Sequence, residues 1–127
     1  IYHTAGDKLQ LFSGADELLC HATLSGSVGA IGTFYNVWGP ACRQARNAVI
    51  NGNFQAGLDF MQIFQSTLAD ILSTGSHWTF LQAALKRLHG VDIGLPRAPL
   101  AVGNREWDTE EIDRLIEGVN RIAHSIS

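Results

Sequence analysis

The chain contains few charged residues for its length and no long apolar run. Charged residues make up 17% of the 127 residues, against roughly 25% in an average soluble domain, so we expect other structure to cover much of the surface. The net charge of −3 excludes a strongly basic surface, and we therefore expect binding to neither nucleic acid nor anionic membranes. No apolar run approaches the roughly 20 residues that span a bilayer, and no basic-then-apolar signal peptide begins the chain.

Cysteine is also scarce, with only Cys20 and Cys42 in the sequence. They form no Cys-x-x-Cys pair and have no histidine at ligand spacing, so they do not predict a zinc site. The five histidines also lack the i,i+4 spacing of metal ligands. We therefore expect no bound metal, two buried reduced thiols and a cytoplasmic location.

Apolar residues make up 46% of the sequence, which is enough to form the core of one domain. The only methionine is Met61, and the chain begins with Ile1. We therefore expect either a processed N-terminus or a segment of a longer protein.

Two short apolar runs have the same sequence pattern. Each run leads to a glycine, and polar residues follow that glycine. The first run covers residues 9–12 and the second residues 28–31, with helical spacing between them from Asp16 to about Leu24. The unbroken second run is typical of a buried parallel strand. The pattern predicts a compact strand–helix–strand unit of the kind that repeats in α/β barrels.

The rest of the chain is predicted to be helical. Helices are expected over residues 38–50, 53–73 and 77–89, followed by a loop over 90–107 and a last helix capped by Asp108. Asn53 and Ser76 are candidate N-caps. An apolar stripe of period 3.6 predicts the buried face of the second of these helices; it comprises Phe54, Leu58, Met61, Phe64, Leu68 and Leu72.

Two parallel strands do not form a stable sheet on their own, because helices can cover the faces but not both edges. We therefore predict an α/β fold from which further strands are missing.

The candidate functional residues follow the two apolar runs. Asp16 and Glu17 lie just beyond the first run, at the end of a strand that carries the active site in α/β barrels. Adjacent carboxylates there can accept hydrogen bonds from a polyhydroxylated ligand. The spacing equally fits helix capping, since carboxylates favour a helix N-terminus. Both readings hold together if Asp16 caps the helix while Glu17 binds a ligand.

Three segments together resemble the pyruvate-dependent class I aldolase family of N-acetylneuraminate lyase and dihydrodipicolinate synthase. The first two resemble barrel strands seven and eight with their loops, and the third resembles the family's C-terminal proline loop. They are FSGADE at 12–17, GAIGTFYN at 29–36 and GLPRAPL at 94–100. The resemblance implies the C-terminal part of a (β/α)8 TIM barrel, with the last two βα units in residues 1–50 and a helical C-terminal extension in residues 51–127.

The Gly-x-Asp-Glu pattern is most similar to the N-acetylneuraminate lyase branch of the family. There, residues at the positions of Gly14, Asp16 and Glu17 bind the polyhydroxyl part of the sugar acid. The position of Thr33 is usually serine in that branch and also contacts substrate, and threonine keeps the hydroxyl. By the same resemblance, the backbone of Ile31 lies near the pyruvate end of the site.

The resemblance also implies where the covalent chemistry takes place. The family forms a Schiff base between a strand-six lysine and pyruvate, and a tyrosine moves the proton; burial in a barrel suits this by lowering the lysine pKa. Both residues are expected upstream of Ile1. Lys8 is too near the first strand, Lys86 is on a predicted helix, and Tyr35 is not the catalytic tyrosine. We therefore predict no catalytic residue in this chain and no separate cofactor.

The expected function is part of an aldolase or lyase that cleaves or forms a carbon–carbon bond to pyruvate, on N-acetylneuraminate or a similar sugar acid. Phe34 replaces a residue that is often threonine, so dihydrodipicolinate synthase or keto-deoxy sugar acid aldolase activity stays an alternative. A non-catalytic helical interaction module is a further alternative. The expected partners are the small-molecule substrate, the missing N-terminal barrel portion and further copies in a homotetramer.

Overall fold

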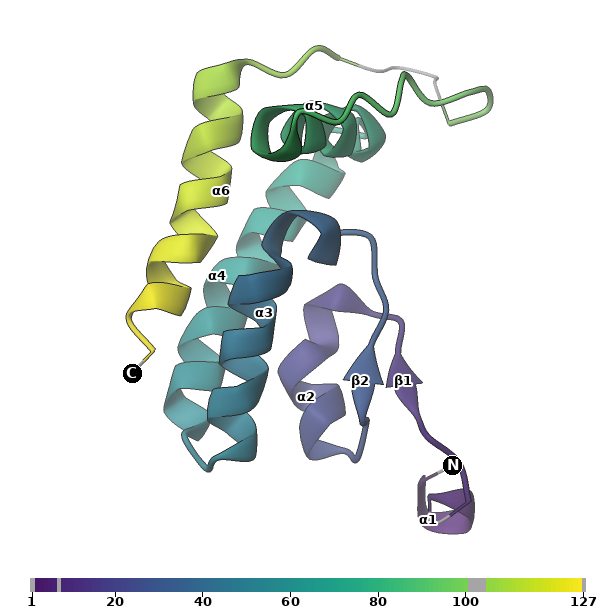
Figure 1. Ribbon diagram of the computed structural model, residues 1–127, viewed down its shortest axis with the longest axis vertical. Helices are drawn as coiled ribbons and strands as arrows, with labels where there is room; N and C mark the ends of the chain where they lie inside the picture. Colours follow the sequence, from purple (N-terminus) through teal and green to yellow (C-terminus); the bar gives the residue numbers. More distant parts are fainter. Residues whose placement is uncertain (1, 7, 101–104, 127) are drawn as a thin grey trace.

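The two apolar runs form a pair of parallel strands in the computed structural model, which describes residues 2–6, 8–100 and 105–126 (Figure 1). β1 is Phe12–Ser13 and β2 is Gly29–Ala30, with Phe12 opposite Gly29. The strands are shorter than predicted, although the Val28 and Ile31 amides extend the pairing by donating to the carbonyls of Leu11 and Ser13. Residues 9–11 are not a strand.

The helices of the chain follow in the predicted order. Before the strands lies α1, Tyr2–Ala5. The strands are connected by η1, a 3-10 helix at Asp16–Leu18, and by α2, Leu19–Leu24. The larger helices are α3, Tyr35–Ile50; α4, Phe54–Ser73; α5, His77–His89; and α6, Thr109–His124. Three of these, α3, α4 and α6, pack against one another, with α2 and the strands to one side (Figure 1).

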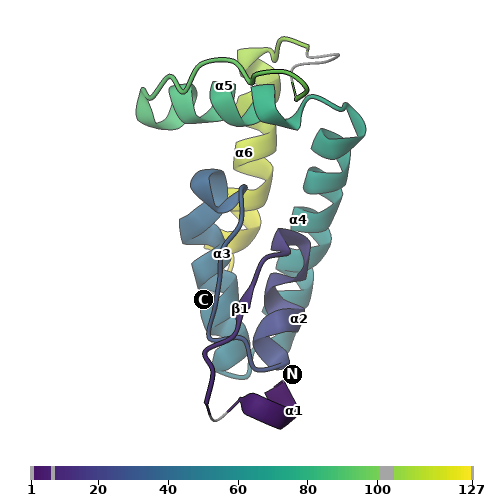
Figure 2. The same cartoon turned by 90° about the vertical axis from the view of Figure 1, so that its right-hand side faces the viewer.

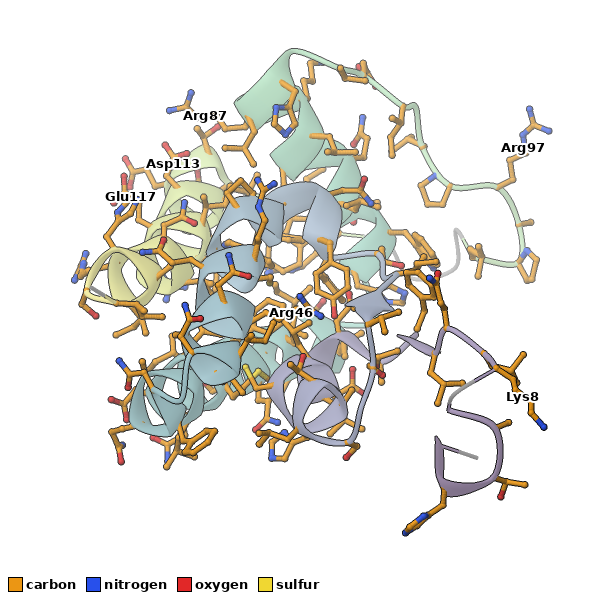
Figure 3. All side chains as sticks on the ribbon, turned by 60° about the horizontal axis from the view of Figure 1, so that its bottom comes forward. Lys8, Arg46, Arg87, Arg97, Asp113 and Glu117 are labelled. Carbon is orange, nitrogen blue, oxygen red and sulfur yellow. The ribbon has the colours of Figure 1, made fainter. Side chains whose placement is uncertain are left out.

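The helix α5 lies across one end of this bundle (Figure 2). It ends at Gly90, whose φ of 68° is in the left-handed region that favours glycine. Arg87 of α5 donates two hydrogen bonds to the carboxylate of Asp113 on α6, at 2.9 and 3.0 Å. Figure 3 shows these two side chains together, on the side of the molecule away from Lys8.

The core centres on Trp38 of α3, which has no exposed surface. Its ring lies 5.8 Å from that of Phe64 and 5.9 Å from that of Phe80, and its indole Nε1 donates to the carbonyl of Ile116. Trp38 itself has non-helical φ and ψ of −117° and 23°, and Pro40 follows inside the helix. Proline lacks an amide hydrogen and crowds the preceding turn, so α3 bends at this position.

The predicted helix starts are partly confirmed. The side chain of Asn53 accepts a hydrogen bond from the Ala56 amide, and that of Asp108 accepts one from the Glu110 amide. Ser76 occupies the N-cap position of α5, but its side chain does not cap that helix. Its hydroxyl instead accepts a hydrogen bond from the Arg105 amide. The capping prediction for Ser76 is therefore wrong, because the returning loop uses the same oxygen.

The apolar stripe of α4 is only partly buried. Met61, Phe64 and Leu68 are in the core, whereas Phe54, Leu58 and Leu72 are 59%, 48% and 49% exposed. The buried face is instead centred on a neighbouring set of positions, because α3 and α6 pack on that side of the helix; it comprises Gly57, Phe60, Met61, Phe64, Thr67, Leu68 and Ile71. The prediction of a core role is wrong for the three exposed residues.

The prediction that both cysteines are buried is confirmed. Cys20 and Cys42 are buried free thiols, and burial raises the pKa of Cys20 to about 11. The apolar side of α6 faces the core, with Ile112, Leu115 and Ile116 buried. In residues 2–6, 8–100 and 105–126, no helix has both the length and the apolar character needed to cross a bilayer.

Phe64 and Phe54 provide a matched test of the α4 packing. Phe64→Ala removes a ring with no exposed surface and is expected to lower the free energy of unfolding by about 3–5 kcal/mol. Phe54→Ala removes an exposed ring and is expected to change it by about 0.5 kcal/mol or less. Urea denaturation followed by tryptophan fluorescence measures both, and equal losses would contradict the observed orientation of α4.

Candidate functional site

An open hollow of about 560 Å³ lies where the two strands end. All five residues predicted from the sequence to bind substrate line it: Gly14, Asp16, Glu17, Ile31 and Thr33. They come from two segments, the first rim segment at residues 14–17 after β1 and the second rim segment at residues 31–34 after β2. Parallel pairing brings the two segments together, because both strands end at the same edge of the sheet.

Asp16 is the buried member of this group, with 5% of its surface exposed. Its Oδ2 accepts a hydrogen bond of 2.8 Å from the amide of Phe34, 18 residues further along the chain. The N-cap of η1 is Ala15, and no side chain caps that helix. The prediction that Asp16 caps its own helix is therefore wrong, since its carboxylate bonds to the start of α3 instead.

Opposing effects act on the Asp16 carboxyl group, and its pKa is raised overall because burial is the largest of them. Burial raises the pKa of its carboxyl group, the hydrogen bond from Phe34 lowers that pKa, and the neighbouring charge of Glu17 raises it. Burial likewise raises the pKa of the Tyr35 hydroxyl, and Asp16 is the largest of the nearby charges that add to this shift.

Gly32 is required by the position of Asp16. A Cβ atom at residue 32 would collide with the Asp16 carboxylate, whereas one at Gly14 would meet nothing within 4 Å. Gly29 is likewise required by the position of the first strand, because a Cβ atom at residue 29 would lie 2.6 Å from the ring of Phe12. The absence of a side chain at Gly29 and Gly32 therefore allows one βα unit to approach the other closely.

The accessible groups of the hollow are Glu17, Thr33 and the backbone of Ile31. Glu17 is exposed, and its carbonyl accepts a hydrogen bond of 2.6 Å from the side chain of Gln65 on α4. Thr33 is partly exposed, and its carbonyl accepts a hydrogen bond of 2.9 Å from the side chain of Asn36. These contacts fix the backbone on both sides of the hollow, so a carboxylate and a hydroxyl are presented to the same space.

Five further lining residues are outside the set predicted to bind substrate: Gly32, Phe34, Asn36, Leu68 and Leu72. Leu68 and Leu72 come from α4 and give the hollow one apolar wall. Leu72 was predicted to lie in the core, and the sequence carries no signal that residues more than 50 positions after Glu17 reach the rim. Phe34 lines the hollow, but its ring is buried and lies 6.3 Å from that of Trp38.

The lysines do not contribute to this hollow. Lys8 follows α1 and points away from the helices (Figure 3), and Lys86 pairs with Asp92 at 3.0 Å. Neither residue lines the hollow. Within the described residues, no group of three or more His, Cys, Asp or Glu side chains is placed to hold a metal ion.

A second hollow, of about 420 Å³, lies between β2 and α3. Two polar atoms in its lining residues are buried without a hydrogen-bond partner, the Tyr35 hydroxyl and Arg46 Nε. A terminal nitrogen of Arg46 donates to the carbonyl of Val28 at 2.8 Å. Buried polar atoms without partners cost about 1–3 kcal/mol each, so this region favours contact with additional polar groups.

Gly32 and Gly14 allow a direct test of the rim packing. Gly32→Ala is expected to lower the free energy of unfolding by about 1–3 kcal/mol, because the new methyl group must displace the Asp16 carboxylate. Gly14→Ala is the control and is expected to change stability by about 0.5 kcal/mol or less. Thermal unfolding of both variants measures the difference, and a fully stable Gly32→Ala chain would contradict the described approach.

The comparisons with known proteins agree with this geometry. Residues 1–117 match the model of the dihydrodipicolinate synthetase family. N-acetylneuraminate lyases from two strains of Clostridium perfringens are 34% identical over 100 residues, which cover 79% of this chain and 34% of each lyase. The chain thus spans about a third of the length of these curated relatives.

The fold itself matches N-acetylneuraminate lyase from Fusobacterium nucleatum, with a TM-score of 0.67 and 25% identity. A structure of that lyase complexed with pyruvate matches with the same TM-score and 27% identity. Each match covers 98% of this chain and 39% of the lyase chain. The chain therefore has the architecture of part of a barrel lyase, and it belongs to the dihydrodipicolinate synthetase family.

Proposed function

We propose that the chain is the C-terminal part of a Schiff-base-forming lyase that cleaves or forms a carbon–carbon bond to pyruvate, with N-acetylneuraminate or a similar sugar acid as substrate. The observation that carries the proposal is the meeting of Gly14, Asp16, Glu17, Ile31 and Thr33 in one open hollow at the strand ends. The relatives named N-acetylneuraminate lyase support this choice of substrate. In this proposal β1 and β2 are barrel strands seven and eight.

The lining residues suit the polyhydroxyl part of a sugar acid. The exposed Glu17 carboxylate can accept hydrogen bonds from neighbouring hydroxyl groups, and the Thr33 hydroxyl can both donate and accept. Gly14 leaves room beside Glu17 because it has no side chain. The backbone of Ile31 then lies toward the pyruvate end of the substrate.

The remaining part of the barrel would supply the lysine and the tyrosine of the covalent step. The small sheet supports a larger assembly, because Leu9, Phe12, Val28 and Ile31 are apolar and 51–71% exposed beside the unpaired strand edges. The unpartnered Tyr35 hydroxyl and Arg46 Nε lie next to β2, where an additional βα unit would pack. No cofactor is needed if the lysine binds pyruvate directly.

Dihydrodipicolinate synthase activity is a second candidate, favoured by the family model that matches residues 1–117. That reaction uses an aspartate semialdehyde rather than a polyhydroxylated acid. The exposed carboxylate of Glu17 in the lining favours the sugar acid, since a carboxylate can accept hydrogen bonds from several hydroxyl groups. Assays of a full-length protein containing this segment on both substrates would separate the two activities.

Borohydride trapping tests where the covalent step takes place. The 127-residue chain, incubated with pyruvate and sodium borohydride, is expected to form no adduct, because neither Lys8 nor Lys86 lines the hollow. A Clostridium perfringens lyase serves as the positive control. A stable pyruvate adduct on the isolated chain, detected by intact mass, would overturn the assignment of the lysine to another part of the barrel.

Substitutions in the hollow test the sugar-binding roles. In a full-length protein containing this segment, Glu17→Gln and Thr33→Val are each expected to raise the KM for N-acetylneuraminate about tenfold. Glu17→Gln removes the charge of an acceptor and Thr33→Val removes a hydrogen bond, and either loss is worth roughly 1–2 kcal/mol. Adduct formation with pyruvate alone should be unchanged. Glu110→Gln, on the exposed start of α6, is the matched control, and equal KM values in all variants would exclude these residues as sugar ligands.

A further inference from the structure

Asp16 connects the two rim segments of the hollow through a side-chain contact that its sequence position does not predict. Its carboxylate is buried at the start of α3, where Oδ2 accepts a hydrogen bond of 2.8 Å from the Phe34 amide. Phe34 occupies the N-cap position of that helix, and no side chain of α3 caps it. A carboxylate from the preceding βα unit therefore satisfies an amide at the start of α3 and interacts favourably with the positive end of the helix.

The opposite oxygen of Asp16 is enclosed as well. Oδ1 lies against the backbone of Gly32, where any side chain would collide with it. The carboxylate is thus held from the second rim segment on both sides, by the Phe34 amide and by the Gly32 backbone. Glu17, the next residue along the chain, is exposed and accepts a hydrogen bond from Gln65 only through its carbonyl. Two adjacent acidic residues therefore have different surroundings.

We propose that Asp16 is a positioning residue, whose hydrogen bond to the Phe34 amide holds the two rim segments in register so that Glu17 and Thr33 face the same hollow. The role follows from geometry: Asp16 directly precedes Glu17, and Thr33 directly precedes Phe34, whose amide Asp16 binds. The coupling is a property of this chain by itself. Only its consequence for sugar binding rests on the proposed function.

The experiment is amide hydrogen exchange of the 15N-labelled 127-residue chain, followed at Phe34 by NMR. Asp16→Ala is expected to speed exchange of the Phe34 amide by at least about tenfold, because the hydrogen bond to a charged acceptor is lost. Asp16→Asn keeps an acceptor oxygen in the same place and is expected to stay within about threefold of the unmodified chain. Glu17→Gln is the matched control, with no change expected at Phe34.

The indole of Trp38, bonded to the Ile116 carbonyl, reports global unfolding in the same spectra. Faster exchange at Phe34 with an unchanged Trp38 signal supports the proposal. Unchanged exchange in Asp16→Ala overturns it, and so does equal loss in Asp16→Ala and Asp16→Asn, since charge alone would then carry the effect. These results do not depend on lyase activity, so failure of this proposal is distinguishable from failure of the proposed function.

A second measurement does not require the alanine variant to fold. The Phe34 amide chemical shift of the unmodified chain is expected to follow ionisation of Asp16 as the pH falls from 7 to 3. Glu17, Tyr35 and Cys42 also carry titratable groups near this carboxylate; burial raises the pKa of Tyr35 and Cys42, so neither ionises in this range. A titration that persists in Glu17→Gln and disappears in Asp16→Asn supports the proposal, and one that persists in Asp16→Asn overturns it.

Discussion

The buried indole of Trp38 is the contact on which the arrangement of the helices depends. It packs against rings from α4 and α5 and donates a hydrogen bond to the backbone of α6. It lies at the bend of α3, four residues after Phe34, so the same helix turn that fills the core also begins at the rim of the hollow. Burial of large aromatic rings contributes much of the stability of a small core, and here it also fixes the direction in which α3 approaches the strands.

Polar contacts connect the rim of the hollow to this core. The Phe34 ring packs against Trp38, while the Phe34 amide bonds to Asp16. Gln65 of α4 bonds to the carbonyl of Glu17 on the opposite side. Side chains of α3 and α4 therefore hold the backbone of Thr33 and Glu17, which carry the accessible hydroxyl and carboxylate. Such support around ligand-binding groups is what keeps a binding site ordered before the ligand arrives.

The two-stranded sheet has fewer stabilising contacts of its own than the helical part of the chain. The two strands pair over only two residues each, and the apolar residues beside them are largely exposed. The hollow between β2 and α3 contains buried polar atoms without partners. Family membership, together with coverage of only 39% of a solved lyase chain, fits a unit that completes its sheet with other strands. The helical part, by contrast, buries the rings of Trp38, Phe60, Phe64 and Phe80 completely.

Local sequence determined the features that depend on neighbouring residues. The helices at 54–73 and 77–89 and the caps by Asn53 and Asp108 were predictable, because periodicity and capping act within a few residues. The parallel pairing was predictable from the strand–helix–strand pattern. The family resemblance identified the five lining residues, although it did not show how they are held. Tertiary structure alone decided the partner of Asp16, the hydrogen bond from the Arg105 amide to the Ser76 hydroxyl, and which apolar residues of α4 face the core. Each of these outcomes depends on which distant segment packs nearby. A local sequence pattern does not determine whether a polar side chain accepts a hydrogen bond from an amide of its own helix or from an amide that folding brings close.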